Sequence, residues 1–316
     1  MKTKSKISVL MSVYNGARFL AKSIESILSQ SFTNFEFIII DDCSTDNSLK
    51  IIKNYQKKDK RIRVISNKVN LGLTKSLNKG LKIAVGKYIA RIDADDYCRE
   101  DRLKKQFDFL EKNKDIFLVA SWASIINKNG NVLRVKKTST TSKAIKKKLE
   151  KNNCLFHSSI MFRRKPRFRY RSKFVYAQDY DFYLNLLTKD KKIAIIPEPL
   201  IFYRTNYNTI SVKRKTQQSL FAQKAKEFYW QRKISGKDDY LALKVQEILK
   251  IKGNKNNLLR LKIIFMLQLG QFSEAKKLYL KYNKLENSFF VKIPLYLFIN
   301  YPVFYKFYCF LRYGKK

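Results

Sequence analysis

Short apolar runs alternate with helical patterns through the first half of the chain. Between the runs, apolar residues recur every three or four positions, as in Leu20, Ile24 and Ile27, which is typical of helices that bury one face. Unbroken apolar strands are buried on both faces of a sheet. The alternation therefore predicts an α/β fold, with a mostly parallel sheet flanked by helices. The strand-length runs lie at residues 7–11, 35–40, 63–66, 88–92 and 116–120.

Polar clusters follow three of these predicted strands directly. SVYN (12–15) follows the first strand, DDCSTD (41–46) the second, and DADD (93–96) the fourth. In parallel sheets, ligands bind beyond the carboxyl ends of the strands. The sequence therefore predicts a ligand site where these three clusters meet.

The chain lacks the glycine motifs that usually cradle phosphates. No GxGxxG follows the first strand, and GxxxxGK[ST] is absent. The phosphates of a bound nucleotide would need another positive charge beside them, and the DADD cluster can supply one by holding a divalent cation. Carboxylates suit Mg²⁺ and Mn²⁺, which keep several waters and bridge to substrate phosphates.

The pattern changes near residue 210, where we expect a boundary between a domain at 1–210 and a helical C-terminal region at 211–316. Helices are predicted there, followed by a basic, aromatic stretch that most simply forms helical core. No transmembrane segment is expected, because the best candidate is shorter than the roughly 18–20 residues that span a bilayer. The predicted helices cover 216–233, 240–252, 257–268 and 273–283.

The charge is strongly positive and unevenly distributed. The 316 residues include 67 Lys and Arg against 25 Asp and Glu, a net charge of +42. Residues 134–173 hold fifteen basic residues and one acid, Glu150. Such a segment attracts nucleic acid, an anionic membrane surface or an acidic ligand, and charge alone does not choose among them.

Cysteine and histidine usage argues against two classes of site. The four cysteines are scattered, and His157 is the only histidine, so neither a disulfide framework nor a Cys/His metal site is expected. This usage suits a reducing compartment. We expect a cytoplasmic protein, with the inner face of the plasma membrane as a site of peripheral attachment.

Six segments in order resemble a family 2 glycosyltransferase with the GT-A fold, of the bacterial surface-polysaccharide type. The resemblance covers roughly residues 6–211, about two-thirds of the chain. The segments read ISVLMSVYN, FEFIIIDDCSTDNS, NLGLTKSLNKGLKIAVGKYIARIDADD, FHSSIMFRR, AQDYDFYLNLL and IPEPLIFYRTNYNTIS.

The resemblance implies a nucleotide pocket at the first strand ends. Ser12, Tyr14 and Asn15 would line it, with Tyr14 packed on the base. Asp42 matches the family residue that hydrogen-bonds the uracil ring, and Asp93, the first acid of DADD, would lie nearer the ribose.

The resemblance also assigns the reacting groups. Asp95 would bind the divalent metal, Mn²⁺ or Mg²⁺, that bridges the diphosphate, and Asp179 would be the general base. His157 and Arg204 match positions on the acceptor side. On residue pattern alone, Asp179 lies on an amphipathic helix where a surface acid is ordinary, and Asp181 competes with it for the role. Gln178 stands where the family usually has Glu.

These assignments favour an inverting, metal-dependent glycosyltransferase that moves a sugar from a UDP-sugar to a glycan or lipid-phosphate acceptor. We expect the basic segment 134–173 to border the acceptor cleft and to engage an acidic acceptor or an anionic membrane, with Phe289–Arg312 as a further membrane contact. The alternatives are a basic nucleic-acid-binding protein or a membrane scaffold with an inactive transferase domain. A nucleic-acid partner is not expected, because no RRM, helix-turn-helix or zinc-finger pattern occurs.

Overall fold

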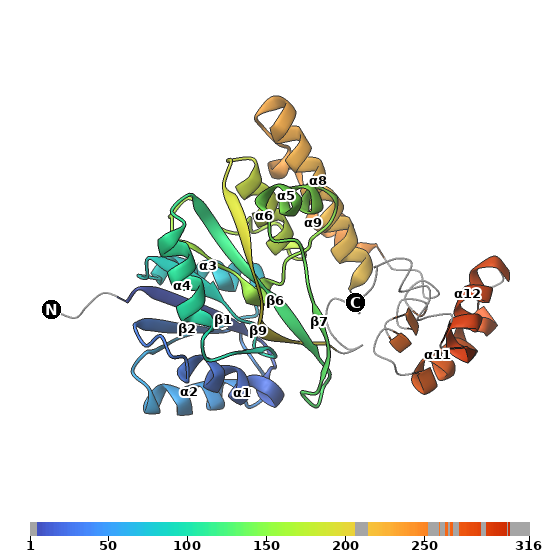
Figure 1. Cartoon of the computed structure of the whole chain (residues 1–316), viewed down its shortest axis with the longest axis horizontal. Helices are drawn as coiled ribbons and strands as arrows, with labels where there is room; N and C mark the ends of the chain where they lie inside the picture. Colours follow the sequence, from blue (N-terminus) through green and yellow to red (C-terminus); the bar gives the residue numbers. More distant parts are fainter. Residues whose placement is uncertain are drawn as a thin grey trace. The chain divides into compact units, whose positions relative to one another are not determined.

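A computed structural model gives the architecture of the chain (Figure 1). It divides into two compact units, one of Met1–Thr205 with Leu220–Val245, the other of Asn206–Ser219 with Gln246–Lys316. The expected boundary near residue 210 falls outside the described residues. These residues are 5–205, 214–251, 259, 263–264, 266–267, 272–285, 289–301 and 303.

The first unit is built on one nine-stranded sheet within the described residues, in the order β3-β2-β1-β4-β8-β6-β9-β5, with β7 paired to β6. The expected α/β class is confirmed: β1, β2, β3 and β4 are parallel to one another, as are β6 and β9. The strands are β1 (Ile7–Val13), β2 (Phe35–Asp41), β3 (Ile62–Ser66), β4 (Tyr88–Arg91), β5 (Tyr97–Cys98), β6 (Ile116–Ile126), β7 (Val132–Lys136), β8 (Met161–Arg163) and β9 (Lys192–Arg204).

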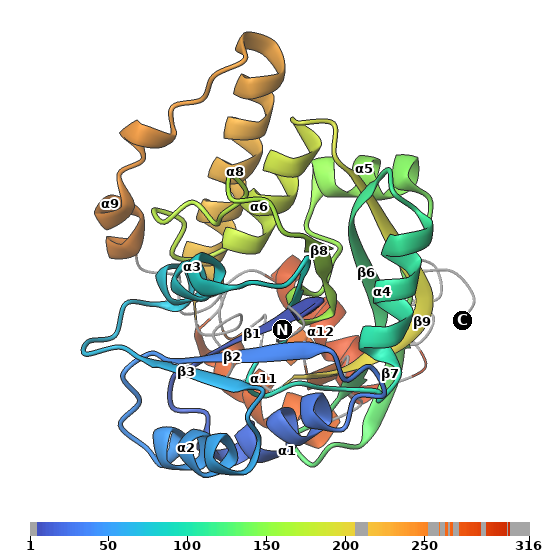
Figure 2. The ribbon, with the colours of Figure 1, turned by 90° about the vertical axis from the view of Figure 1, so that its left-hand side faces the viewer.

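Helices cover both faces of the parallel part of the sheet. Figure 2 shows α1 and α2 on one side of β1–β3 and α3 on the other. Helix α1 buries an apolar stripe of Leu20, Ile24 and Ile27, as its spacing predicts, while α2 buries Ile52 and α3 buries Leu77. The helices of this unit are α1 (Ala17–Leu28), α2 (Ser48–Lys58), α3 (Leu73–Ile83), α4 (Arg102–Lys112), α5 (Ser142–Lys151), α6 (Gln178–Leu187) and most of α8 (Lys215–Ser235).

The central strands are apolar because both of their faces are covered. All seven residues of β2 are buried, and Ile38 and Ile39, which point to opposite faces, are both fully buried. Burying each such side chain contributes about 1.5–3 kcal/mol. This packing fixes the strand ends, and the loops after them, at one edge of the sheet.

The second half of the sheet differs from a simple parallel arrangement. Strand β8 runs antiparallel to both β4 and β6, its two neighbours. It is three residues long, too short to show an alternating pattern in the sequence. Its reversal brings the 3₁₀ turn His157–Ser159, which precedes β8, next to the residues that follow β4.

The second unit contains helices α9 (Val245–Lys250), α11 (Phe272–Leu285) and α12 (Phe289–Asn300). Tyr279, Tyr282, Leu295 and Ile299 are buried where α11 packs against α12, as expected for a helical core. Most of the predicted helix at 257–268, and the segment beyond residue 303, lie outside the described residues. Within the described part of the chain, no helix is both long and apolar enough to cross a bilayer.

Candidate functional site

The carboxyl ends of β1, β2 and β4 meet at one edge of the sheet. Val13 pairs with Asp41 across β1 and β2, and the Ile92 amide, just after β4, donates to the Leu10 carbonyl of β1. The three polar clusters singled out in the sequence are therefore neighbours in space. They form the floor of the candidate site.

The loop after β1 is hydrogen-bonded to the loop after β2. The Asn15 side-chain oxygen accepts a hydrogen bond of 2.8 Å from the Thr45 amide, and Asn15 itself has a left-handed backbone, with φ 52°. Tyr14, beside it, is 54% exposed. An aromatic ring held at a strand end and left uncovered can stack on a flat ligand.

Asp42 is buried and bound by the loop that precedes α3. Its carboxylate accepts hydrogen bonds from the Asn67 side chain (2.7 Å) and from the Leu71 and Gly72 amides (2.9 and 2.8 Å). The amide of Gly72 reaches Asp42 with a φ of 81°, a conformation that favours glycine. Asp42 is thus an acceptor fixed by three hydrogen bonds, with part of its lone-pair capacity unused, and its own amide donates to the carbonyl of Val13, the residue before Tyr14.

The DADD turn after β4 is anchored by two of its four members. Asp96 is buried, and its carboxylate accepts a hydrogen bond of 2.7 Å from the Arg204 amide. Asp93 is paired with the buried Arg91. The Ser158 hydroxyl lies 2.7 Å from the Asp93 carboxylate and 2.5 Å from that of Asp96.

A single Ser158 proton cannot bridge two ionised carboxylates. Burial, together with the charges of Asp95 and Asp93, raises the pKa of Asp96 well above its ordinary value. The raised pKa of Asp96 favours its protonated form, which relieves the repulsion between the two carboxylates that meet at Ser158. Burial opposes the charge of Asp93, but the charge of Arg91 and the hydrogen bonds from Ser158 and Arg91, with a contribution from His157, together outweigh burial and hold the pKa of Asp93 below the ordinary value.

Asp95 is the acid of the turn whose carboxylate lacks a side-chain hydrogen bond from the described residues. Across residues 5–205 and 214–251, no side chain of another residue hydrogen-bonds its carboxylate, which is partly exposed. Burial, and next the charge of Asp93, raises the pKa of Asp95 to about 6. A carboxylate with free oxygens whose charge is poorly balanced is suited to bind a cation.

A second acid reaches the same region from the start of α6. Asp179 lies in the first turn of α6, after Ala177, whose backbone is left-handed with φ 56°. Its carboxylate accepts one side-chain hydrogen bond, of 2.8 Å, from the amide of Asn153. Burial raises the pKa of Asp179, against the opposing effect of the Tyr180 amide and of Asn153.

Asp181, the neighbour that the sequence left as a competitor, is differently placed. It is almost fully buried, and its carboxylate is ion-paired with Arg171, whose Nε lies 2.9 Å from it. Arg171 also binds Asp238 over 2.6 Å. Of the two acids, only Asp179 has no ion pair with a cation among the residues that the structure describes.

Tyr203, on β9, links the two groups of acids. Burial raises its pKa, and the charges of Asp96, Asp93, Asp95 and Asp179 raise it further. All four carboxylates therefore lie within electrostatic reach of one phenol. Asp42 is turned toward the loop at 67–72, two strands away from β4.

The two expected acceptor-side residues are both buried. The His157 Nε2 lies 2.7 Å from the Tyr170 hydroxyl, and burial, with Arg91, lowers the pKa of His157 to about 3, so that the ring is neutral. Arg204 donates to backbone carbonyls of Asp95 (2.9 Å) and of Asn127 (2.9 Å). Arg204 therefore braces the backbone around Asp95.

Three contributors were not singled out in the sequence: Arg91, Asn153 and Ser158. Ser158 lies within the FHSSIMFRR segment, which pointed to this region without separating Ser158 from its neighbours. Asn153 and Arg91 carry no local signal, because their partners Asp179 and Asp93 are brought to them only by the fold.

The residues present fit a divalent cation held mainly by its substrate. Within the described parts of the chain, no group of three or more His, Cys, Asp or Glu side chains is placed to hold a metal ion. Mg²⁺ and Mn²⁺ sites in nucleotide enzymes typically use one or two carboxylates, with phosphates and waters as the other ligands. Asp95, with Asp93 nearby, supplies that number of carboxylates.

Comparison with known sequences identifies the relatives of this chain. Residues 8–169 match the sequence model of the family described as glycosyl transferase family 2. An uncharacterized glycosyltransferase of Methanocaldococcus jannaschii is 40% identical over 235 residues, 73% of this chain and 81% of its own length. TuaG of Bacillus subtilis, named for teichuronic acid biosynthesis, is 35% identical over 130 residues, 41% of this chain and 51% of its own.

Solved structures share the fold. S. aureus TarS 1–349 in complex with UDP-GlcNAc has a TM-score of 0.55 at 17% identity, covering 93% of this chain and 90% of that one. The mannosyltransferase PcManGT of Pyrobaculum calidifontis, in complex with GDP-Man and Mn²⁺, has a TM-score of 0.56 at 13% identity, covering 95% and 88%. The expected GT-A fold is confirmed.

Proposed function

Since the chain belongs to glycosyl transferase family 2, we propose that it is an inverting, metal-dependent glycosyltransferase that uses a nucleotide-sugar donor, a UDP-sugar, and a glycan or lipid-linked acceptor. The solved structures with UDP-GlcNAc and with GDP-Man support a nucleotide-sugar donor. The relative named for teichuronic acid supports a role in surface polysaccharide synthesis and an acidic acceptor.

In this proposal the donor lies along the strand ends. Tyr14 stacks on the base, Ser12 and Asn15 line the pocket, and Asp42 accepts from the base with its unused lone pair. Asp93 lies nearer the ribose. The exposed Tyr14 ring and the fixed Asp42 carboxylate support this assignment.

Asp95, with Asp93 beside it, would hold the divalent cation. When bound, the cation would stabilise the negative charge of the departing nucleoside diphosphate. The raised pKa of Asp95 agrees with this role, because a bound cation favours the ionised carboxylate that burial disfavours. The Mn²⁺ in the PcManGT complex also supports it.

Asp179 would act as the general base. Its carboxylate takes the proton of the acceptor hydroxyl while that oxygen bonds to the anomeric carbon and the sugar–phosphate bond breaks on the opposite side. This single displacement inverts the anomeric centre, and base catalysis contributes about 10²–10⁴-fold. The raised pKa of Asp179 makes it a stronger base than an exposed carboxylate, and Asp181 is engaged by Arg171. His157 and Arg204 would shape the acceptor side, through Tyr170 and the Asp95 backbone respectively.

One observation carries the proposal: Asp95 and Asp179 come from distant parts of the chain, form no ion pair with any described residue, and both act on the Tyr203 phenol. The test is a panel of nucleotide-sugars scored for Mn²⁺- or Mg²⁺-dependent release of the nucleoside diphosphate. Asp95→Asn and Asp179→Asn should each abolish the release. The matched control is Asp115→Asn, at an exposed acid paired with Lys192, which should leave the release unchanged. If Asp179→Asn releases diphosphate and transfers sugar at the normal rate, the assignment of the base is wrong.

A further inference from the structure

The basic segment 134–173 is split by the fold between two places. Residues 134–136 lie on β7 and 142–151 on α5, whereas Arg164 lies beside the start of β4, where its backbone amide donates to Lys87 and its Nε to Gly86. The acidic turn follows the other end of β4. Arg164 therefore lies at the far end of β4 from the acidic turn, and the expectation that the segment borders the acceptor cleft stays a prediction.

The first place is joined to the acids by a short series of contacts. The Lys136 amino group lies 5.2 Å from the centre of the Phe156 ring, and that ring lies 4.9 Å from the ring of Tyr203. Tyr203 precedes Arg204, whose amide donates to the Asp96 carboxylate over 2.7 Å and whose Nε donates to the Asp95 carbonyl over 2.9 Å. Two ring contacts therefore connect the Lys136 cation to the strand end that holds the acidic turn.

Two further cations, Arg134 and Lys148, repel the charge of Lys136. Burial, with repulsion from Arg134 and Lys148, lowers the pKa of Lys136. The charges of Lys148 and Lys136 also act on the thiol of Cys154, where they lower its pKa against the effect of burial. In the described parts of the chain, no acidic residue is paired with Arg134, Lys136 or Lys148. We call these three residues the acceptor-side cations.

We propose that the acceptor-side cations bind an anionic group, a carboxylate or a phosphate, carried by the acceptor. This inference rests on the proposed function and names the substrate class of that site. The donor is assigned to the ends of β1, β2 and β4, so a ligand on the β7 and α5 side of Tyr203 is the acceptor. A cluster of unpaired cations beside that position selects acceptors by charge and raises their local concentration.

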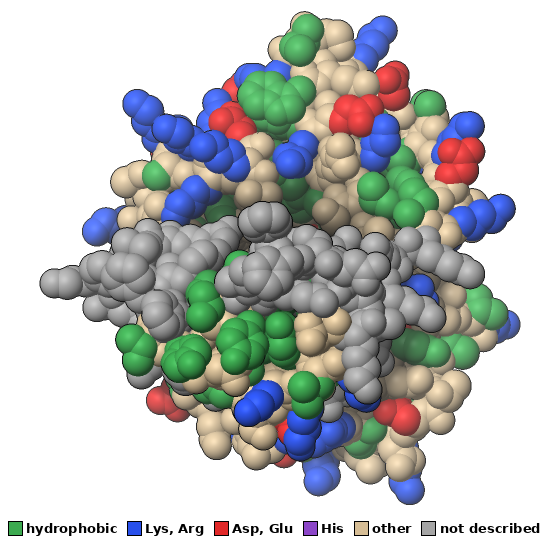
Figure 3. All heavy atoms as spheres, turned by 90° about the vertical axis from the view of Figure 1, so that its right-hand side faces the viewer, with side chains coloured by type: hydrophobic (Ala, Val, Ile, Leu, Met, Phe, Trp, Pro, Cys, Tyr) green, Lys and Arg blue, Asp and Glu red, His purple; other side chains and the backbone are tan. Residues whose placement is uncertain are grey.

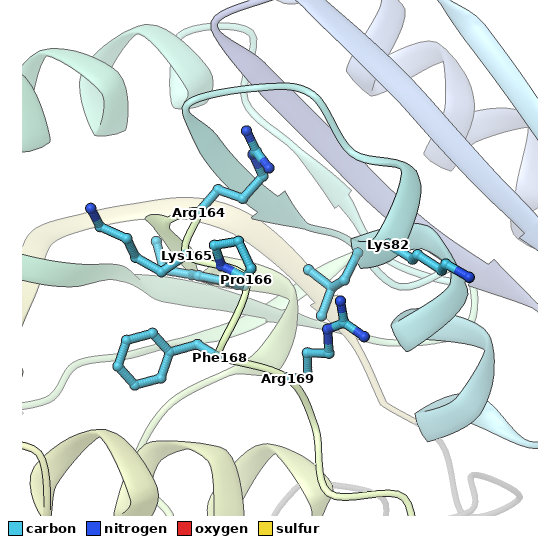
Figure 4. A pocket seen from close by; sticks show the side chains of 8 residues that line it. Lys82, Arg164, Lys165, Pro166, Phe168 and Arg169 are labelled. Atoms are coloured by element: carbon cyan, nitrogen blue, oxygen red, sulfur yellow. The ribbon is translucent and has the colours of Figure 1, made fainter.

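The second place provides a matched control. A small pocket there is lined by apolar Phe162, Pro166 and Phe168 and by four basic residues, Lys82, Arg164, Lys165 and Arg169. Figure 4 shows the amino groups of Lys82 and Lys165 pointing to opposite sides, so their charges do not converge on one ligand. Basic side chains are also spread over the face shown in Figure 3, with few acids among them. Charge alone therefore does not distinguish the acceptor-side cations; the contact of Lys136 with Phe156 does.

The rate at which the Cys154 thiol is labelled reports on the charge of the cluster and does not depend on enzymatic activity. In the full chain with Cys43→Ser and Cys309→Ser, we compare its labelling rates by an anionic and a cationic methanethiosulfonate. The ratio of anionic to cationic rates should fall about tenfold or more in Lys136→Glu/Lys148→Glu and change little in Lys82→Glu/Lys165→Glu, which alters the net charge equally. Equal ratios in the two double variants would overturn the proposal.

Ligand protection then tests recognition of the anion. Methyl glucuronide and the phosphate ester of methyl glucoside carry the two anionic groups, and methyl glucoside is the neutral control. At least one anionic glycoside should slow the labelling of Cys154 more than the neutral one does, and Lys136→Glu/Lys148→Glu should lose that difference. Equal protection by all three glycosides, or none by any, would overturn the proposal. The glycoside that protects Cys154 more strongly shows whether the cations prefer a carboxylate or a phosphate.

Failure of this inference can be told from failure of the proposed function. Diphosphate release from the donor in water needs no acceptor, so it should persist in Lys136→Glu/Lys148→Glu. Absence of any release in the unaltered protein would contradict the proposed function, while the labelling of Cys154 would still report on the cations. Normal release with no anion-dependent protection would contradict only the further inference.

Discussion

The side-chain amide of Asn153 donates a hydrogen bond of 2.8 Å to the carboxylate of Asp179. Asn153 lies just after α5, and Asp179 lies in the first turn of α6, so the contact joins two helices at the edge of the site. A donated hydrogen bond stabilises the ionised carboxylate and lowers its pKa, in opposition to burial. Asn153 therefore controls the pH range in which Asp179 can accept a proton.

Replacement of Asn153 by Ala should shift the pH dependence of transfer. Without the amide, the pKa of Asp179 rises further, so the acidic limb of the kcat/KM profile should move to higher pH. A hydrogen bond to a charged group is worth about 1.5–3 kcal/mol, and part of this is recovered from water, so a shift of about one pH unit is expected. The adjacent, exposed Asn152→Ala is the control and should leave the limb in place. A profile unchanged in Asn153→Ala would contradict the role of Asn153.

Replacement of Arg171 should lower stability far more than replacement of an exposed partner. Arg171→Ala leaves Asp181, which is almost fully buried, without its counter-charge, and removal of one partner from a buried pair costs about 3–5 kcal/mol. Lys192→Ala breaks the exposed pair with Asp115 and should cost about 0–1 kcal/mol. Urea unfolding of both variants gives the comparison. Similar losses in the two would mean that Arg171 does not stabilise Asp181 as the structure indicates.

The sheet and the meeting of its polar loops at one edge could be predicted because burial on both faces demands continuous apolar strands, as in β1 and β2, and parallel strands end together. The choice between Asp179 and Asp181 could not. The two acids are two residues apart in one helical turn, and only the fold brings Arg171 to Asp181. The role of Arg91 could not be predicted for a similar reason. In the sequence it resembles an exposed strand residue, yet it is buried beside Asp93.

Asp95 should make the metal-free protein less stable as the pH rises. Its folded pKa, about 6, lies above the ordinary value of 3.8, so the folded state binds the proton more tightly than the unfolded state does. Its contribution to stability is therefore present below pH 4 and is lost between about pH 4 and 6. Asp95→Asn should remove this part of the pH dependence. Thermal unfolding across the range measures it, and an unchanged profile in the variant would contradict the raised pKa.

The last prediction concerns Tyr14, whose exposed ring is assigned to the nucleotide base. Stacking of a base on an aromatic side chain is worth about 1–3 kcal/mol, so Tyr14→Ala should weaken UDP binding about 5- to 150-fold. Tyr14→Phe keeps the ring and should bind UDP nearly as well as the unaltered protein, because no hydrogen bond of the Tyr14 hydroxyl is part of the assignment. Isothermal titration with UDP in the presence of Mn²⁺ compares the three proteins. If Phe and Ala weaken binding equally, the hydroxyl and not the ring face contacts the nucleotide; if neither does, the base lies elsewhere along the strand ends.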